Sequence, residues 1–565
     1  MNKEQWKQAV QDIRTYLSKQ ETFIQKTHNS FYGTEAPVPL FLTLGHRKQR
    51  ARVYPLHGNT LETALKKVHQ KGMSVLKQQN IEWVKVDVPI RLERCTWNDL
   101  LALSAETKKN YLRKGISFDD QFHLAFLEQE IHANGFLHKS DNGEGDEWNM
   151  KNLNLYVKNY RDQRYPVRPN HMQHMILFDT ISWFYDSNEE KTYELESGGV
   201  DNGRRKINDV DQETALDVVS QSSRFLEQQV KRNGRFVYGY FAGFHKEIKW
   251  YNILRHCSTL YSMLEAYSHT KDHDLKLSCE RALRYVLREA VVPGENSRGE
   301  QCLYVVDKEN DEEIKLGANA AAILAITKYS LVCDNETYIE EARCLARGIC
   351  EMQLENGQFM HVLNGWNLSE KERFRIVYYD GEAAFALMRL YALDPDERWL
   401  QTVTRAFDYF IENRHWKHHD HWLSYCTNEL TKYRPEDKYY QFGLKNVEKK
   451  LDFIYHRITA YPTFLELLMA SYQMIENMKA QGKEYLLEGF DEEKVYRTIE
   501  HRAVHQLNGF FYPELAMYFR KPEAILGSFF IRHHSFRVRI DDIEHNISGY
   551  LNYAEQYAPV RLMEV

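Results

Sequence analysis

Two kinds of helical pattern alternate along the chain from about residue 168 onward. One kind is amphipathic with a charged face, and it covers 211–231, 272–290, 336–354, 396–413 and 491–507. The other kind is apolar on nearly every face, and it covers 171–186, 251–267, 316–331, 379–392, 456–475 and 542–556. A helix with one charged face suits an outer layer, whereas a helix that is apolar all round has to be enclosed by others. The pattern predicts six inner helices inside an outer ring, with the sixth outer helix supplied by 118–132 or 150–162.

Residues 1–165 have a different pattern. Short apolar runs at 40–44 and 83–88 are bounded by turn residues and predict strands, and 60–77 has helical periodicity after a start signal. We therefore expect a mainly α-helical protein with two domains. An α/β module of unassigned role occupies 1–165, and the helical ring occupies 166–565.

A short motif recurs where charged-faced helices end. The glycine of an Asn-Gly pair supplies the left-handed cap, and the phenylalanine that follows folds back onto the bundle. The three copies are Asn233-Gly234, Asn356-Gly357 and Asn508-Gly509. This pattern resembles the outer-helix endings of the (α/α)₆ toroid enzymes, which include glycoside hydrolases, polysaccharide lyases, sugar epimerases and terpenoid cyclases. The resemblance covers 168–556 and implies an (α/α)₆-like toroid that acts on a carbohydrate.

Composition limits the possible binding partners and the cellular compartment. A net charge of −6 and a pI near 6.5 argue against nucleic acid and against anionic membrane surfaces as partners. No apolar run approaches the ~18 residues of a membrane span, and the first residues form a charged amphipathic helix. The eight cysteines include no CxxC pair, so we expect reduced thiols and a cytoplasmic protein.

Ionisable residues at the starts of the apolar helices are the candidate catalytic groups. Asp380 and Glu382 are about 200° apart on a helix, so one of them is expected to cap or pair while the other acts as acid or base. His545 follows Asp541 by four residues and Asp542 by three, which predicts an Asp that orients a His general base. A role as capping groups and structural ion pairs stays open for these carboxylates.

His256, in an apolar helix, is the remaining catalytic candidate, with a satisfied core histidine as the alternative. Arginines at the helix starts suit a carboxylate or phosphate, and tyrosines suit a sugar ring. The substrate-binding candidates are Tyr251, Asn252, Arg255, Asn319, Tyr379, Arg457, Tyr461 and Arg539.

We expect neither a metal nor a cofactor. The His-rich run 415–422 lacks regular ligand spacing and reads as an exposed outer connection, and the chain has no Walker loop, no GxGxxG after a strand and no GxSxG. The prediction is an enzyme that works on an anionic, uronic-acid-like sugar or oligosaccharide by hydrolysis, elimination or epimerisation. The alternative is a non-catalytic scaffold on which the N-terminal module docks a protein partner.

Overall fold

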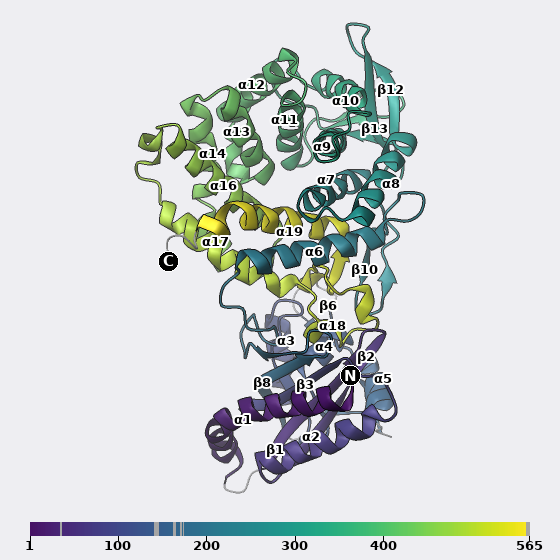
Figure 1. Cartoon of the computed structure of the whole chain (residues 1–565), viewed down its shortest axis with the longest axis vertical. Helices are drawn as coiled ribbons and strands as arrows, with labels where there is room; N and C mark the ends of the chain where they lie inside the picture. The colour runs from purple at the N-terminus through teal and green to yellow at the C-terminus, as the bar shows by residue number, and fades with distance from the viewer. Residues whose placement is uncertain (34–36, 140–145, 162–164, 170–171, 173, 561–565) are drawn as a thin grey trace.

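The computed structural model describes the chain from residue 1 to 560 except 34–36, 140–145, 162–164, 170–171 and 173. Figure 1 shows a helical ring in the upper part of the molecule and a sheet with helices below it. Both parts agree in kind with the two patterns of the sequence.

The ring closes through contacts between its inner helices. Among the described residues, the six inner helices are α7 (Ile253–Thr270), α9 (Leu316–Cys333), α11 (Tyr378–Tyr391), α13 (His421–Tyr433), α16 (Thr463–Ala480) and α19 (Ile540–Asn552). Helix α7 packs against α9 and α19, α11 against α9 and α13, and α16 against α13 and α19. Each inner helix therefore has an inner neighbour on both sides, and the ring is complete.

Each outer helix follows an inner helix along the chain, except the first outer helix, which precedes the first inner helix. In the described part of the chain these are α6 (Gln212–Gln229), α8 (His273–Glu289), α10 (Ile339–Glu351), α12 (Glu397–Glu412), α14 (Asp437–Glu448) and α17 (Glu492–Gln506). Helix α12 buries one apolar face against α11, and its other face is exposed. This confirms an (α/α)₆ toroid and five of the predicted outer helices.

The predicted first inner helix at 171–186 is wrong. Met175–Asp186 forms strand β8, which lies between β3 (Trp83–Cys95) and β4 (Gly115–Ser117) in the sheet. A continuous apolar run fits a central strand buried on both faces as well as it fits a buried helix. The sixth inner helix is α13, and the sixth outer helix is α14 in place of 118–132 or 150–162.

The N-terminal part is an antiparallel sheet with the order β2-β1-β3-β8-β4-β5, to which β9 adds through β8. The remaining strands are β1 (Val38–His46), β2 (Gln49–Gly58), β5 (Ala125–Phe126) and β9 (Lys191–Leu195). Because β8 and β9 belong to this sheet, the α/β part continues past the predicted boundary at 165. The helices of this part are α1 (Lys3–Tyr32), α2 (Leu61–Leu76), α3 (Trp97–Glu106), α4 (Glu128–Ala133) and α5 (Met150–Tyr160).

Opposite faces of the sheet have different covers. Leu40 and Leu42 pack with α1 and α2 in one apolar cluster, whereas Phe41 between them belongs to the core that continues into the toroid. The chain that covers this second face is the α17–α19 connection, where Ala51 N–H donates to Met517 O over 2.7 Å. Because side chains alternate along β1, one face of the sheet packs against α1 and α2 and the other face packs against the toroid.

Shorter elements fill the connections of the toroid. They are α15 (Leu451–His456), α18 (Pro513–Ala516), β10 (Gly239–Phe241), β11 (Lys246–Glu247), β17 (Arg537–Arg539), β12 (Val291–Glu295), β13 (Gln301–Asp307), β14 (Glu313–Lys315), β15 (Val362–Asn364) and β16 (Glu370–Glu372). Strands β6 (Leu137–Lys139) and β7 (Asp146–Trp148) form a hairpin in the N-terminal part. In the described chain, α9 alone is long and apolar enough to cross a membrane, and 78% of it is buried in the ring.

Candidate active site

The two ends of the toroid differ in the length of their connections. Two residues separate the inner helix α7 from the outer helix α8, whereas 26 residues that include β12–β14 lead from α8 back to the inner helix α9. The long connections therefore gather around the N-terminal ends of the inner helices. Loops on a rigid scaffold are where binding and catalytic residues concentrate, and the predicted site residues lie at this end.

Two arginines and two aspartates form a chain of ion pairs there. Arg255 Nε lies 3.6 Å from Asp541 Oδ2, and Arg539 Nη2 lies 2.9 Å from the same oxygen. Arg539 Nε also lies 3.2 Å from Asp542 Oδ2. The structure thus brings these four predicted residues together, with both aspartates held by arginines.

Glu382 lies on the other side of Arg255, in the first turns of α11. Its side chain is buried, and burial raises its pKa to about 7 although the Arg255 charge lowers it. Gly317 of α9 packs directly on this carboxyl group, and a Cβ at that position would overlap it. Within the described chain, Glu382 Oε2 has no hydrogen-bond partner. At neutral pH, Glu382 can therefore give or take a proton.

Glu544 is a second buried carboxyl group near Arg255. Ser258 Oγ donates a 2.7 Å hydrogen bond to Glu544 Oε1, while Oε2 has no partner among the described residues. Burial raises the pKa of Glu544 to about 8, against the lowering effect of His545 and Arg255. Glu544 is thus mostly protonated at neutral pH.

His545 has different neighbours from those that the sequence predicts. Its Nδ1 lies 2.8 Å from Glu466 Oε2, and its Nε2 lies 3.6 Å from Glu544 Oε1. The prediction that Asp541 or Asp542 orients His545 is wrong, because arginines hold both aspartates and Glu466 of the neighbouring helix α16 reaches the ring first. Burial raises the pKa of Glu466 and lowers that of His545, so the imidazole is neutral.

His421, at the start of α13, completes a buried triad with Glu466 and His545. One ligand atom from each of the three lies within 4.8 Å of the others, so the triad has the donor atoms for a divalent cation. The His421 and His545 rings meet edge to face, with centroids 5.2 Å apart. Although Glu466 Oε2 lies 2.8 Å from His545 Nδ1, it has no hydrogen-bond partner among the described residues, so the two groups are close but not hydrogen-bonded.

Asp380 is held away from this cluster by histidines. His361 Nδ1 accepts the Arg375 backbone N–H, so its Nε2 carries the proton and donates to Asp380 Oδ1 over 3.3 Å. His415 Nδ1 lies 3.6 Å from the other oxygen of Asp380. Asp380 therefore has the pairing role, and Glu382 is the one that faces Arg255.

The reading of the His-rich run as an exposed connection is wrong. His415 and His421 are both buried, and Asp420 between them caps α13 by accepting the Trp422 N–H over 2.9 Å. The run is buried because its second half is the start of the inner helix α13.

His256 lies outside the cluster with both ring nitrogens occupied. Its Nε2 donates to Ala282 O over 3.0 Å, and its Nδ1 lies 2.7 Å from the hydroxyl of Tyr251. Burial lowers the pKa of His256 to about 4, which keeps the ring neutral. Tyr251 and His256 thus tie α7 to α8 as core groups.

The two predicted asparagines have structural partners. Asn252 caps α7 by accepting the backbone N–H groups of Leu254 and Arg255. Asn319 is buried, accepts the Val305 N–H and donates to Lys315 O. Both therefore order the end of the ring at which the cluster lies.

Tyrosines line the approach to the cluster. Tyr379 is buried beside Glu382, and the negative charge of Glu382 adds to burial in raising its pKa. Tyr378 and Tyr461 are half-buried and hydrogen-bonded to each other. Both residues are thus partly exposed, although Tyr378 lies beside the His421 ring and Tyr461 beside the Phe464 ring.

Basic side chains continue outward from Arg539 toward the N-terminal part. Burial lowers the pKa of His533 to about 3, helped by the positive charges of Lys108, Arg457 and Arg537. Burial together with charges that include Arg539 and Lys108 lowers the pKa of the adjacent His534 to about 4. We call Lys108, Arg457, His533, His534 and Arg537 the basic rim.

The sequence reasoning missed Glu466, Glu544 and His421. Glu466 had a detectable signal, since it is a lone carboxylate in the apolar run 464–470. His421 directly follows an aspartate that can cap a helix and begins an apolar periodic segment, which is a helix start signal. Nothing in the local sequence singles out Glu544 from the adjacent aspartates.

No family model matches the sequence, and no curated protein does either. The structure is similar to solved α/α-toroid enzymes that process carbohydrates. A sugar epimerase from a ruminal bacterium is 13% identical over 60% of this chain and 99% of its own, with a TM-score of 0.46. Cellobiose 2-epimerase from Bacillus thermoamylovorans is 16% identical over 61% and 100%, with a TM-score of 0.46. The GH76 α-mannanase of Bacteroides thetaiotaomicron is 10% identical over 62% and 97%, with a TM-score of 0.41. At these values we transfer neither residue roles nor activity to this chain.

Proposed function

We propose that this chain is an enzyme that transfers protons on a sugar carrying an anionic group. The observation that carries the proposal is the pair Glu382 and Glu544, two buried carboxyl groups near Arg255 that each leave an oxygen without a partner in the described chain. A helical scaffold gains no stability from such groups, because each loses its hydration without full compensation. A site whose proton donors await a substrate accounts for them.

His545 is the proposed base. Its neutral imidazole would remove a proton from the carbon next to the carbonyl or carboxylate of the sugar, and the electrons of the C–H bond would pass to that oxygen. Arg255 and a protonated Glu382 would stabilise the negative charge that develops there. Glu466, whose Oε2 lies 2.8 Å from His545 Nδ1, would pack against the ring and restrict its orientation.

This arrangement favours epimerisation or elimination over hydrolysis. Return of a proton to the opposite face of the same carbon gives an epimer, whereas departure of a group from the neighbouring carbon gives an unsaturated sugar. Hydrolysis requires an ionised carboxylate opposite the acid. Burial raises the pKa of both Glu382 and Glu544, so neither is a strong carboxylate base at neutral pH.

The substrate class follows from the surroundings. Tyr378 and Tyr461 offer rings for stacking on a sugar, and Trp250, 48% exposed just before α7, is available at the same end of the ring. Lys108 and Arg457 of the basic rim add positive charge, which suits a uronic acid. Lys108 of the rim comes from the N-terminal part, which would therefore form one wall of the mouth.

Ligand binding tests the proposal. Calorimetric titration with glucuronate, galacturonate and the neutral sugars glucose and galactose should show tighter binding of a uronate than of its neutral counterpart. We expect the difference to disappear in a Lys108→Gln, Arg457→Gln double variant. Equal binding of charged and neutral sugars would remove the anionic part of the proposal, and no binding of any sugar would favour the scaffold.

A further inference from the structure

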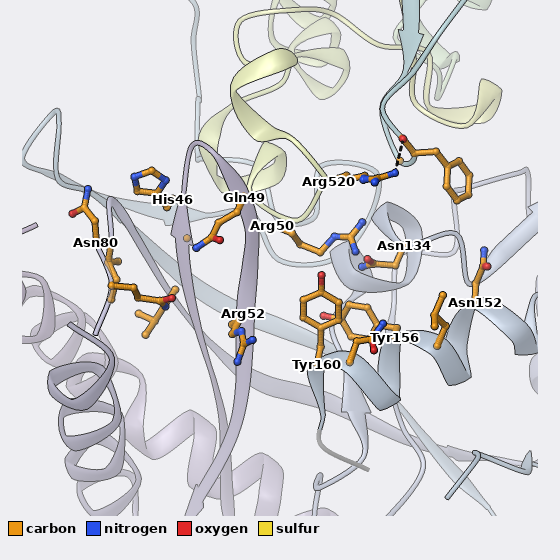
Figure 2. A pocket seen from close by; sticks show the side chains of 18 residues that line it. His46, Gln49, Arg50, Arg52, Asn80, Asn134, Asn152, Tyr156, Tyr160 and Arg520 are labelled. Carbon is orange, nitrogen blue, oxygen red and sulfur yellow. Dashed lines mark hydrogen bonds between the residues drawn. The ribbon is translucent and has the colours of Figure 1, made fainter. Parts of the chain in front are cut away.

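A cavity of about 590 Å³ lies at the junction of the sheet and the toroid, apart from the cluster described above. Figure 2 shows its walls: strand β2 and helix α5 on the side of the N-terminal part, and Arg520 beyond α18 on the side of the toroid. Its volume is typical of sites for small molecules, which range from about 300 to 1,000 Å³. We call this cavity the junction pocket.

The junction pocket is strongly basic. Arg50, Arg52 and Arg520 line it, and none of the described lining residues is Asp or Glu; His46, also in the wall, lies 3.6 Å from the Glu82 carboxylate. No carboxylate of the described chain forms an ion pair with any of the three arginines. Like charges gathered in a concave surface repel one another and concentrate a positive potential there. Such an arrangement is most stable when an anion occupies it.

Backbone carbonyl groups hold two of the arginines in place. Arg50 Nε donates to Tyr518 O over 3.2 Å, and Arg520 Nη1 donates to Phe244 O over 3.4 Å. These acceptors orient the guanidinium groups and leave their full charge uncompensated. Figure 2 shows that Arg50, Arg520 and Tyr160 all belong to the wall of this pocket. Two preoriented guanidinium groups match the oxygens of one phosphate.

Neutral polar groups complete the wall. The Tyr160 ring lies under the Arg50 guanidinium at 5.7 Å, and Tyr160 stacks on Tyr156 with centroids 4.8 Å apart. The pocket thus presents a firm aromatic surface beside the arginines.

We propose that the junction pocket binds a small phosphorylated metabolite, with its phosphate held by Arg50 and Arg520 and its remaining part against Tyr160. Three arginines without a carboxylate favour phosphate, with up to two charges per group, over a single carboxylate. The ligand would contact both parts of the molecule and so stabilise their junction. The proposal does not depend on the chemistry proposed for the toroid.

Titration calorimetry with inorganic phosphate, pyrophosphate, AMP, ADP and glucose 6-phosphate tests this site. We expect at least one of these probes to bind. The comparison of phosphate and pyrophosphate with AMP, ADP and glucose 6-phosphate tells whether the phosphate alone, a nucleoside or a sugar provides the affinity. Because a charge-assisted hydrogen bond contributes about 1.5–3 kcal/mol, Arg50→Gln and Arg520→Gln should each weaken binding by about tenfold or more.

Two matched variants separate this site from other arginines. Arg434→Gln changes an exposed arginine at the end of α13, and Arg457→Gln changes the basic rim; neither residue lines the junction pocket. Both should leave phosphate affinity unchanged. The proposal is overturned if no probe binds at millimolar concentration, if binding survives in the Arg50→Gln, Arg520→Gln double variant, or if only Arg457→Gln weakens it.

Discussion

Glu382 illustrates how burial and charge compete at a single residue. The Arg255 charge favours the carboxylate form, yet loss of hydration dominates and the pKa rises from 4.5 to about 7. A shift of that size corresponds to about 3 kcal/mol between the two protonation states in the folded protein. The protein holds this carboxyl group at some cost in stability at high pH, as is common for catalytic groups.

The stability of the protein should reflect this shift. Because the folded-state pKa of Glu382 is raised, its contribution is fully present below pH 4.5 and is lost as the pH rises through about 7. The Glu382→Gln variant lacks this titration. We expect the free energy of unfolding of the wild type to fall relative to that of Glu382→Gln by about 2–3 kcal/mol between pH 4.5 and 8.

Chemical denaturation at several pH values measures this difference. The exposed Glu493→Gln on α17 is the control, since it should give a difference that does not change with pH. A Glu382→Gln difference as flat as the control would show that Glu382 is not a protonated buried acid.

Substitution of His545 should lower turnover, whereas substitution of His256 should lower stability. His545→Asn removes the proposed base and should lower turnover by about 10²–10⁴-fold while the sugar still binds. His256→Asn breaks core hydrogen bonds to Ala282 and Tyr251 and should lower stability without a comparable loss of turnover per folded molecule. Kinetics and unfolding on the same samples give both quantities, and equal losses of turnover in the two variants would contradict the assignment.

At the scale of elements, periodicity predicted the ring but not its full membership. Helices α9 and α11 are apolar on all sides and were placed correctly, as were five outer helices. The α13 segment was missed because its histidines and aspartate look like an exposed turn until partners on other helices are known. The sequence predicts a helix where strand β8 lies, because the strands that pair with β8 are distant along the chain and give no local signal.

For the candidate site, the sequence predicts which residues lie there but not how they pair. That Arg255, Glu382 and Asp541 lie at the ends of inner helices follows from the helix pattern. Which carboxyl group meets His545 depends on the rotation of α16 against α19, and a spacing rule within one helix cannot supply that.

The Asn-Gly motif allows a test at the scale of one connection. Gly234 and Gly357 have φ of +92° and +89°, but neither caps a helix: α6 ends at Gln229 and α10 at Glu351, and each glycine lies in the turn that follows. Gly509 lacks a positive φ and lies in a 3-10 turn, so the predicted left-handed helix cap is wrong at all three positions. A Cβ on Gly234 or Gly357 would also overlap the backbone carbonyl of Arg281 or Arg405.

Alanine substitutions should distinguish the two glycines with positive φ from Gly509. Gly234→Ala and Gly357→Ala should each lower the free energy of unfolding by about 1–3 kcal/mol, and Gly509→Ala should lower it less. Urea denaturation of the three variants measures the effect. Equal losses at all three sites would show that the left-handed conformation is not what these glycines supply.

At the scale of the whole molecule, the sheet and the toroid share one core. Tyr518 of the α17–α19 connection is fully buried, and its hydroxyl lies 3.1 Å from Thr43 and 3.3 Å from Lys85 Nζ in the sheet. Lys85 is itself paired with Asp87 at 2.5 Å. Removing either part would expose these buried polar groups and the apolar core around them.

The chain should therefore unfold in one step. Differential scanning calorimetry should show a single transition, with the same midpoint by circular dichroism and by tryptophan fluorescence. A fragment that begins at residue 206 lacks the sheet and should not unfold cooperatively. Two separate transitions in the full chain, or a stable fragment, would show that the two parts fold independently.

Proton exchange at carbon tests the central proposal most directly. Wild type incubated in D₂O with glucuronate, galacturonate and their oligosaccharides should place deuterium on the sugar carbon next to the carbonyl or carboxylate, as seen by NMR. His545→Asn should lose this exchange. The same spectra would reveal an epimer, an unsaturated sugar or a hydrolysed bond. Deuterium incorporation that disappears with His545 would support a proton-transferring site at the ends of the inner helices. Binding without any exchange, or hydrolysis alone, would contradict it.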